Sequence, residues 1–365
     1  MSLNCGIIGL PNVGKSTLFT ALTSVQAEAA NYPFCTIEPN IGIVNVPDKR
    51  LKDIEALVPT EKLVPAIVEF VDIAGLVKGA SKGEGRGNQF LSNIRNVGVL
   101  AHVLRCFDDP DIIHVDANID PLADIDVINI ELALADLETV EKRIDKNEKL
   151  ARAKNKEAME ILPLLERVRE RLSQGRPVSS LDLDDDQKLK LRDLHLITMK
   201  KTLLVCNVDE KGLTEENQYV KKVKELARRE GAEVIVICAK LEAEIAGLES
   251  DEEKADFLEA AGLKESGLSA MIRASFKALG LGTFFTAGPK EIRAWTIHEG
   301  DKAPDAAGVI HTDFERGFIK AEVYHYDDLM EYKSEKKVKE AGKLRLEGKE
   351  YVVRDGDIMH FKFNV

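Results

Sequence analysis

Short apolar runs alternate with longer polar and amphipathic segments through most of this chain. The apolar runs predict strands at 5–8, 41–46, 66–75, 99–107, 202–206 and 232–238. The segments that separate them favour helices at 17–22, 89–97, 215–229, 252–261 and 268–279. Strands that alternate with helices are typical of an α/β fold built on a doubly wound, largely parallel sheet. We therefore predict such a sheet.

The alternation is interrupted between 128 and 197. Residues 130–172 are poor in glycine, contain one proline and are rich in Glu, Lys, Arg, Ala and Leu. Their apolar positions recur at the helical spacing of three and four, at Leu134, Leu137, Val140 and Ile144. This predicts a long helical arm, a pair of antiparallel helices that continues to about 196. Because the α/β pattern then returns, we expect the arm to be an insertion in one domain made of 1–127 and 198–280.

Beyond Gly280 the pattern changes again. Short alternating runs that contain aromatic residues appear at 293–297, 318–324, 351–353 and 358–363. They predict a small mixed β domain over 281–365. We identify no catalytic constellation in it.

The first strand and the first helix are joined by Gly9 to Ser16, a loop of the pattern G-x-x-x-x-G-K-S. This is the context of a phosphate-binding loop, in which glycines let backbone N–H groups converge on one phosphate at a helix N-terminus. The amine of Lys15 would reach the β- and γ-phosphates, and the hydroxyl of Ser16 would hold Mg²⁺. The alternative is a turn that binds nothing, which the agreement of motif, flanks and position disfavours.

Two further positions extend the predicted Mg²⁺ site. Thr36, in the polar stretch 27–40, is the candidate second ligand, because such loops close over a γ-phosphate when a threonine hydroxyl completes the metal shell. The strand at 66–75 ends in D-x-x-G, where Asp72 can hold a metal-bound water and the Gly75 N–H can contact the γ-phosphate. Each could be an ordinary loop residue, but their order behind the phosphate loop favours the joint interpretation.

Leu76 follows Gly75, in the place where small signalling GTPases carry a glutamine that orients the attacking water. Leucine cannot polarise water, so hydrolysis needs another group or is slow. His114 is a candidate because its loop leaves the same carboxyl edge of the sheet; a solvated histidine is the alternative. The glycine-rich stretch 79–87 is expected to order only with nucleotide or a partner, unless it is a plain flexible loop.

A base-recognition motif is expected after the last two strands of the sheet. Asn207-Val208-Asp209-Glu210 lies where GTPases carry N-K-x-D, and Ala239-Lys240 lies where they carry S-A-K. The usual aspartate accepts two donors from guanine, and Glu210 adds a methylene that displaces its oxygens from this geometry. Val208 replaces the lysine whose stem lies over the base. We therefore predict a preference for ATP; the alternative is a drifted loop that still selects guanine.

Composition excludes several classes of protein. The chain has 365 residues, 44% of them hydrophobic and 31% charged, and no apolar run approaches the roughly 18–20 residues of a membrane span. Its five cysteines are scattered without metal-ligand spacing, and four of them lie in strand-like runs typical of reduced core thiols. With the first strand almost at the N-terminus, no signal peptide is evident, and we expect a cytoplasmic protein with no membrane partner.

The formal net charge of −12 argues against a protein coated in nucleic acid, so an RNA partner would have to meet a local basic surface. The arm offers one candidate. Its basic positions are Lys142, Arg143, Lys146, Lys149 and Arg152. A solvated helix face is the alternative account of these charges.

The phosphate loop, the Asp72 to Leu76 sequence with its glycine-rich sequel and the order of the domains resemble the Obg-related P-loop proteins. Within that group, the Asn207 to Glu210 motif, the helical insertion and the C-terminal stretch resemble the YchF (Obg-like ATPase) family over essentially the whole chain. Residues 284–314 look like the TGS domain of that family, a ubiquitin-like β-grasp fold.

The resemblance implies a protein that binds ATP and GTP, hydrolyses ATP preferentially and associates with the ribosome, which we expect to be through the large subunit. By position it assigns phosphate binding to Asn12, Val13, Gly14, Lys15, Ser16 and Thr17. It assigns Mg²⁺ to Ser16 and Thr36, and the catalytic histidine to His114. The base contacts fall on Asn207, Val208, Glu210 and Ala239. Asn12 is also a candidate ligand for K⁺, because related P-loop proteins use an asparagine there, and a monomer is expected.

Two other functions are compatible with these residues. One is a conventional GTPase, and the other is an RNA-binding scaffold in which the nucleotide only stabilises the fold. The joint presence of Lys15, Ser16, Thr36 and Asp72 disfavours the scaffold, because a structural nucleotide does not need the full metal shell.

Overall fold

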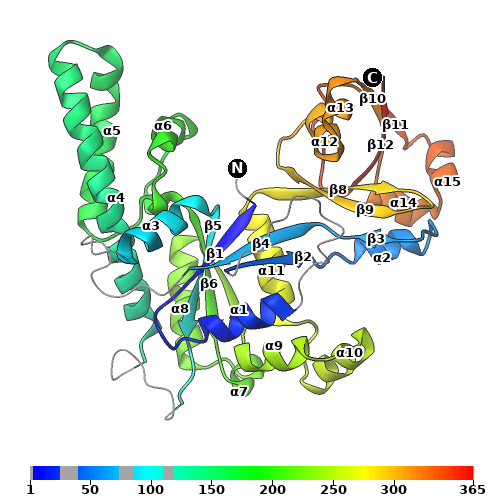
Figure 1. Cartoon of the computed structure of the whole chain (residues 1–365), viewed down its shortest axis with the longest axis horizontal. Helices are drawn as coiled ribbons and strands as arrows, with labels where there is room; N and C mark the ends of the chain where they lie inside the picture. Colours follow the sequence, from blue (N-terminus) through cyan, green and yellow to red (C-terminus); the bar gives the residue numbers. More distant parts are fainter. Residues whose placement is uncertain (1–2, 25–39, 74–85, 110–118, 365) are drawn as a thin grey trace. The chain divides into compact units, whose positions relative to one another are not determined.

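The computed structural model describes residues 3–24, 40–73, 86–109 and 119–364. It divides into two compact units (Figure 1). Of the described residues, the first unit contains 3–24, 40–42, 69–73, 86–109 and 119–271. The second unit contains 43–68 and 272–364. No helix among the described residues combines the length and the apolar character needed to cross a membrane.

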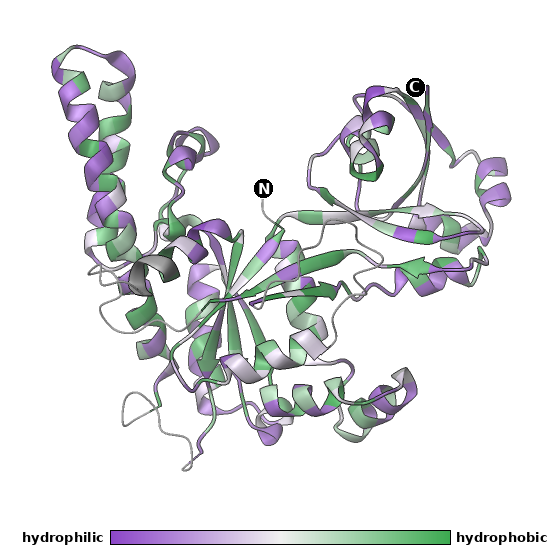
Figure 2. Ribbon diagram, in the orientation of Figure 1, coloured by the Kyte–Doolittle hydropathy of each residue, from purple (hydrophilic) through white to green (hydrophobic). Residues whose placement is uncertain are grey.

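A six-stranded sheet forms the centre of the first unit, in the order β2-β4-β1-β5-β6-β7. The strands are β1 (Asn4–Ile8), β2 (Ile41–Asn45), β4 (Ile67–Asp72), β5 (Val99–Arg105), β6 (Lys201–Asn207) and β7 (Glu233–Ile237). β1 pairs in parallel with β4 and β5, and β6 pairs in parallel with β5 and β7. All seven residues of β5 are buried, as expected for a strand covered on both faces. The predicted doubly wound sheet is confirmed, and its strands are largely green in Figure 2.

Helices flank this sheet at nearly the predicted positions. They are α1 (Lys15–Ser24), α3 (Arg86–Asn96), α7 (Glu210–Thr214), α8 (Gln218–Glu230), α9 (Ala239–Ala246), α10 (Asp251–Ala260) and α11 (Gly267–Ala278). The sequence did not predict α7 and α9, which are short and follow their strands without a long polar break. Asp209 caps α7 by accepting from the Gly212 N–H at 2.8 Å, a local signal that accounts for its start.

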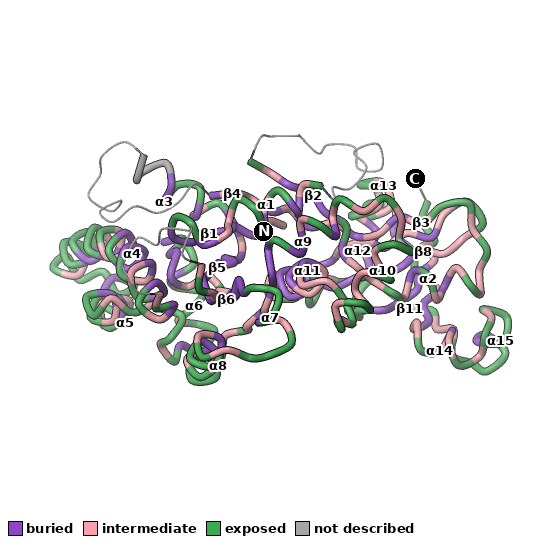
Figure 3. Tube along the Cα trace, turned by 90° about the horizontal axis from the view of Figure 1, so that it is seen from below, coloured by how far each residue is buried: buried purple, intermediate pink, exposed green. Residues whose placement is uncertain are grey.

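The arm consists mainly of α4 (Pro121–Arg152) and α5 (Lys156–Ser173), followed by the short α6 (Asp185–Leu191). Its own apolar core includes Val140, Leu165 and Leu191. α4 begins before the predicted boundary at 128, because its first turns belong to the sheet: Ile125 packs in a cluster with residues of β5, β6 and α8. The outward faces of α4 and α5 are largely green, hence exposed, in Figure 3.

The second unit contains a mixed six-stranded sheet in the order β11-β10-β12-β8-β9-β3. Its strands are β3 (Leu63–Val64), β8 (Leu281–Ala287), β9 (Ile292–His298), β10 (Phe318–His325), β11 (Arg345–Glu347) and β12 (Asp357–Phe363). Its helices are α2 (Arg50–Glu55), α12 (Ala303–Ile310), α13 (Thr312–Arg316), α14 (Tyr326–Tyr332) and α15 (Glu335–Glu340). α12 packs its alanines against Phe284 and Phe318. The expected strand at 351–353 is reduced to one bridge between Lys302 and Val352.

Residues 46–66, which link β2 to β4, pack differently from the expectation for the first domain, which assigned all of 1–127 to the nucleotide-binding fold. The contacts of this segment group it with the second unit. β3 pairs in parallel with β9, and the Ile292 N–H donates to the Lys62 carbonyl at 2.9 Å. Arg50 forms an ion pair with Asp355 at 2.7 Å. The segment is therefore a strand and a helix of the second unit, inserted between β2 and β4.

Candidate nucleotide site

The backbone of the loop from Gly9 to Ser16 is curled at two residues with positive φ. Asn12 has φ 64° and Gly14 has φ 94°. The Leu18 N–H donates to the Gly14 carbonyl at 3.0 Å, so that the helical hydrogen bonds of α1 begin at the end of the loop. The N–H groups of a first helical turn have no carbonyl partner within their own helix. This is the arrangement that binds phosphate at a helix N-terminus.

Asn207 holds the phosphate loop from the end of β6. Its Nδ2 donates to the Val13 carbonyl at 2.9 Å, and its Oδ1 accepts from the Ala239 N–H at 2.9 Å. The side chain is buried, and a Cβ at Gly14 would lie 2.2 Å from its Nδ2. The amide therefore ties three loops together, a positioning role that sequence reasoning missed. No local pattern around Asn207 indicates these partners, because Val13 and Ala239 lie far from it in the chain.

Lys15 and Asp72 form an ion pair between Nζ and Oδ1. Both side chains are mostly buried, with exposed fractions of 11% and 22%. The Asp72 N–H also donates to the Asn40 carbonyl at 2.9 Å, which fixes the end of β4. The structure thus brings the predicted phosphate-binding amine and the predicted carboxylate of the metal site together. Sequence reasoning had placed both groups at the site but had not predicted their direct contact.

The described part of the predicted Mg²⁺ site is Ser16 and Asp72. Ser16 and Thr17 are exposed at the start of α1, beside the ion pair of Lys15. Within the described ranges no group of three or more His, Cys, Asp and Glu side chains is placed to hold a metal ion. Mg²⁺ in phosphate sites is usually bound by one or two protein ligands with waters and phosphate oxygens, so this donor set fits the ion. Thr36, Gly75, Leu76 and His114 lie outside the described residues.

Val208 and Ala239 are buried rather than open to a ligand. Val208 is 2% exposed and packs with Leu104 and Val220 in the core beside β6. Its N–H donates to the Ile237 carbonyl at 2.8 Å. The predicted contact of the Val208 side chain with the base therefore has no open surface in this structure.

Glu210 and Lys240 lie at the surface of the same two loops. Glu210 is the first residue of α7, and Lys240 is in the first turn of α9. Their Oε1 and Nζ atoms are 3.0 Å apart, and both side chains are well exposed. The hydrogen bond to Glu210 is the main cause that raises the pKa of Lys240 above its usual value. This pair was not predicted.

The loop that carries His114 is anchored where it leaves β5. The buried Arg105 donates to the Phe107 and Asp109 carbonyls at 3.2 and 3.0 Å. Tyr219 of α8 donates to Asp108 Oδ1 at 2.9 Å. These contacts fix the first residues of the loop. His102, within β5, is fully buried, and this burial lowers its pKa to about 4, so it is a neutral core residue.

The five basic positions of the arm that are candidates for contact with RNA differ in their ion pairs. Lys142 pairs with Glu138, Arg143 with Asp193 and Arg152 with Glu148. Lys146 and Lys149 are exposed, with no ion pair to any described residue. Exposed pairs within one helix contribute little and exchange readily with water and ions.

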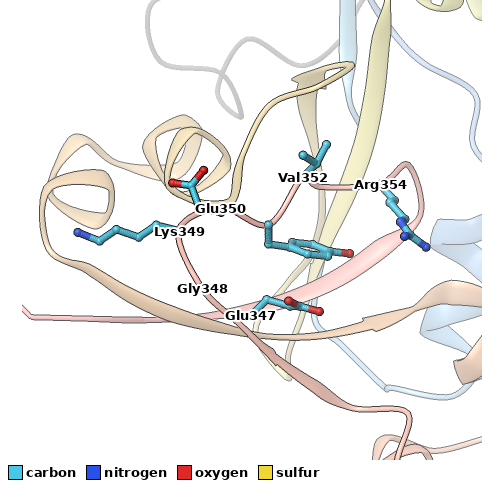
Figure 4. A pocket seen from close by; sticks show the side chains of 7 residues that line it. Glu347, Gly348, Lys349, Glu350, Val352 and Arg354 are labelled. Carbon is cyan, nitrogen blue, oxygen red and sulfur yellow. The ribbon is translucent and has the colours of Figure 1, made fainter.

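An open hollow of about 760 Å³ lies in the second unit, along the segment between β11 and β12 (Figure 4). Its lining residues are Glu347, Gly348, Lys349, Glu350, Tyr351, Val352 and Arg354. The Tyr351 hydroxyl donates to Asp357 Oδ2 at 2.7 Å, and Glu350 accepts from Lys302 at 2.5 Å. These polar groups hold the segment to the domain, and none belongs to a nucleotide motif.

Known proteins match both parts of the chain. A family model described as "50S ribosome-binding GTPase" matches residues 4–162, and the model YchF-GTPase_C, described as "Protein of unknown function (DUF933)", matches residues 281–364. The "Ribosome-binding ATPase YchF" of Bacillus subtilis (strain 168) is 55% identical over the whole of both chains, and that of Escherichia coli O157:H7 is 52% identical. The solved YchF GTPase of Schizosaccharomyces pombe has a TM-score of 0.89 and 38% identity, over 99% of this chain and 98% of that one. This chain belongs to the YchF family.

Proposed function

We propose that this protein is an ATPase that binds the ribosome. The observation that carries the proposal is the phosphate loop between β1 and α1, with Lys15 held against Asp72 and the loop backbone held by Asn207. The full-length relatives named as ribosome-binding ATPases support both the activity and the partner. The function implies ATP and GTP as ligands and the cytoplasm as the compartment.

Each residue of the site has a defined task in this proposal. Lys15 exchanges its contact with Asp72 for the β- and γ-phosphates, and the N–H groups of residues 12–17 bind the phosphate oxygens. Ser16, Thr36 and, through a water, Asp72 hold Mg²⁺, which neutralises charge on the phosphates. His114 orients the attacking water, because Leu76 has no polar group for this task. Asn12 is the proposed ligand of K⁺, if hydrolysis differs between sodium and potassium salts.

The preference for ATP rests on the state of the base-recognition motif. Asn207 uses its amide donor and acceptor within the protein, and the Ala239 N–H donates to Asn207. The buried Val208 offers no polar group to the base. Guanine selectivity normally comes from charged hydrogen bonds worth roughly 1.5–3 kcal/mol each. Most of that selectivity is absent here.

Phosphate release tests the proposal. We expect the protein to hydrolyse ATP faster than GTP and to be stimulated by ribosomes, and Lys15→Ala to abolish hydrolysis in a folded protein. Lys188→Ala, which removes an exposed lysine of α6, is the matched control and should retain the full rate. A rate in Lys15→Ala equal to that of the unmodified protein would exclude the phosphate-loop assignment. Faster turnover of GTP would identify a conventional GTPase, and no turnover of either nucleotide would favour the scaffold.

The ribosome or RNA contact is proposed for the outer face of the arm. Lys146 and Lys149 are exposed there without an ion pair to a described residue, so they are available to phosphate groups. Lys142, Arg143 and Arg152 would first have to leave carboxylate partners. The proposal therefore depends most on the first two lysines.

A further inference from the structure

We propose that Lys240 is a specificity-determining residue, which disfavours GTP by holding the Glu210 carboxylate in an ion pair. This inference rests on the proposed preference for ATP and assigns part of it to a residue outside the N-x-x-E motif. The two side chains meet at 3.0 Å between Oε1 and Nζ. We assign Lys240 no role in binding phosphate or Mg²⁺.

Most other polar groups of the two loops are already engaged. Both ends of the Asn207 amide are bonded to backbone, and the Ala239 and Val208 N–H groups donate to Asn207 and to Ile237. The Asp209 carboxylate accepts from the Gly212 N–H. The side chains of Glu210 and Lys240 are exposed, and they directly follow Asp209 and Ala239 in these two loops.

The ion pair joins two separate loops. The neighbouring Lys211 pairs with Glu215 four residues away, as exposed charges on one helix commonly do. Lys240 reaches instead across 30 positions of sequence, from the start of α9 to the start of α7. Asn207 fixes the end of β6 and the Ala239 N–H, so the two partners start from defined backbone positions. The pair therefore links the two loops that carry the base-recognition motif.

The pair has different consequences for the two bases. Guanine presents two donors side by side, N1–H and the N2 amino group, and a carboxylate must turn both oxygens to them. A carboxylate whose Oε1 is held by an ammonium is partly neutralised and cannot turn freely. Adenine presents a single donor, the N6 amino group, beside the N1 acceptor. The remaining Oε2 satisfies that donor, and the Lys240 ammonium is compatible with the acceptor.

The test is a set of dissociation constants measured by calorimetry in Mg²⁺ for ATP, GTP and ITP, which lacks the N2 amino group. Lys240→Met should shift the ratio of the ATP and GTP constants toward GTP by roughly two- to fivefold, the range of a single exposed ion pair. It should also make GTP bind more tightly than ITP, because the released carboxylate can then accept from N2. Lys240→Arg should retain the original ratio. Lys211→Met removes the same charge from α7 and should change nothing.

The outcomes distinguish a failure of the proposed role of Lys240 from a failure of the proposed preference for ATP. An unmodified protein that binds GTP tenfold more tightly than ATP would overturn the proposed preference. An unmodified protein that prefers ATP, with a ratio unchanged in Lys240→Met, would overturn the role of Lys240 alone. If Lys211→Met shifts the ratio of the ATP and GTP constants by the same amount, the shift is an effect of general surface charge. This result would also overturn the role of Lys240. Because Lys240 is largely exposed, its replacement should leave the fold intact, which a thermal melt verifies.

Discussion

Two insertions interrupt the strands of the first sheet, and they are stabilised in different ways. The arm, between β5 and β6, contains its own apolar core, built from α4, α5 and the turns that follow. The segment 46–66, between β2 and β4, contributes strand β3 to the sheet of the second unit and helix α2 beside it. An insertion can therefore be an independent extension or a component of another domain. The difference depends on where its apolar residues find partners.

The two insertions also differ in the polar contacts that attach them. At the root of the arm, Asp136 is fully buried and accepts from the Ile197 N–H, the Thr198 N–H and the Thr198 hydroxyl, at 2.9, 2.8 and 2.7 Å. The segment 46–66 is attached by more exposed groups. Arg50 reaches Asp355, and the Tyr326 hydroxyl donates to Asp53 Oδ2 at 2.6 Å. Changes at these contacts test whether the insertions are stabilised separately.

The largest effect is expected from Asp136→Ala. The change leaves three donors of the arm root without their acceptor, and burial of such unpaired groups should lower the free energy of unfolding by about 3 kcal/mol. Urea unfolding followed by circular dichroism measures the loss. Asp145→Ala, on the exposed face of the same helix, is the control and should stay within about 0.5 kcal/mol of the unmodified protein.

The same unfolding experiment can follow the stability of the second unit by itself. Trp295 is the only tryptophan of the chain and lies in β9, the strand that pairs with β3, so its fluorescence reports on the second unit. If the arm is independent of that unit, the fluorescence transition should move less than the circular dichroism transition. Equal shifts in both signals would show one cooperative unit and would contradict the comparison.

A smaller effect is expected from charge reversal on the arm. Replacing Lys146, Lys149 and Arg152 with glutamate should weaken ribosome or RNA binding about tenfold, roughly 1.4 kcal/mol. Each lost phosphate contact should also reduce the slope of log affinity against log salt by about 0.7–0.9. ATP hydrolysis without ribosomes should not change. The measurement is a salt titration of ribosome or RNA binding. The control is a variant in which Lys221, Lys222 and Arg228 of α8 are replaced with glutamate, and it should bind as the unmodified protein does.

Two results would contradict the proposal that the outer face of the arm binds the ribosome or RNA. If binding keeps its original salt dependence, the lysines of the arm are solvated charges, as the alternative interpretation holds. A loss of equal size in the α8 variant would point to the overall charge of the protein instead.

The sequence predicted the arm but not the sheet that residues 46–66 join, and the reason is physical. Apolar residues at helical spacing, such as Val140 and Ile144, pack against a helix that follows closely in the chain, so the local pattern contains the answer. β3 has only two residues, and its partner Ile292 lies far along the sequence. A strand so short has no period to detect, and nothing in 47–66 indicates which sheet it joins.

In the candidate site, too, local motifs were predictable from the sequence and contacts between distant loops were not. The residue types and spacing of the phosphate loop predicted Lys15 and Ser16, and the D-x-x-G motif after the strand at 66–75 predicted Asp72, because each motif is continuous and its chemistry is stereotyped. The contacts between loops were not predictable: Asn207 with Val13, and Glu210 with Lys240. The assignment of Val208 to the base rested on its position in the motif, and the core packing that buries it depends on residues from other elements.

The smallest effect is expected from Tyr326→Phe, which removes one hydrogen bond between α14 and α2 inside the second unit. The lost bond to Asp53 is only partly buried and should cost about 1 kcal/mol of unfolding free energy. The same bond is the main cause that raises the pKa of Tyr326 to about 12. A raised folded-state pKa means that the stabilisation is complete below the usual tyrosine pKa of about 10 and is lost as the pH rises through 12. The difference between the two proteins, followed through Trp295 fluorescence in urea, should therefore be constant from pH 7 to 9 and shrink above pH 10. A difference that grows with pH, or none at pH 7, would show that the hydrogen bond from Tyr326 to Asp53 does not stabilise the attachment of residues 46–66.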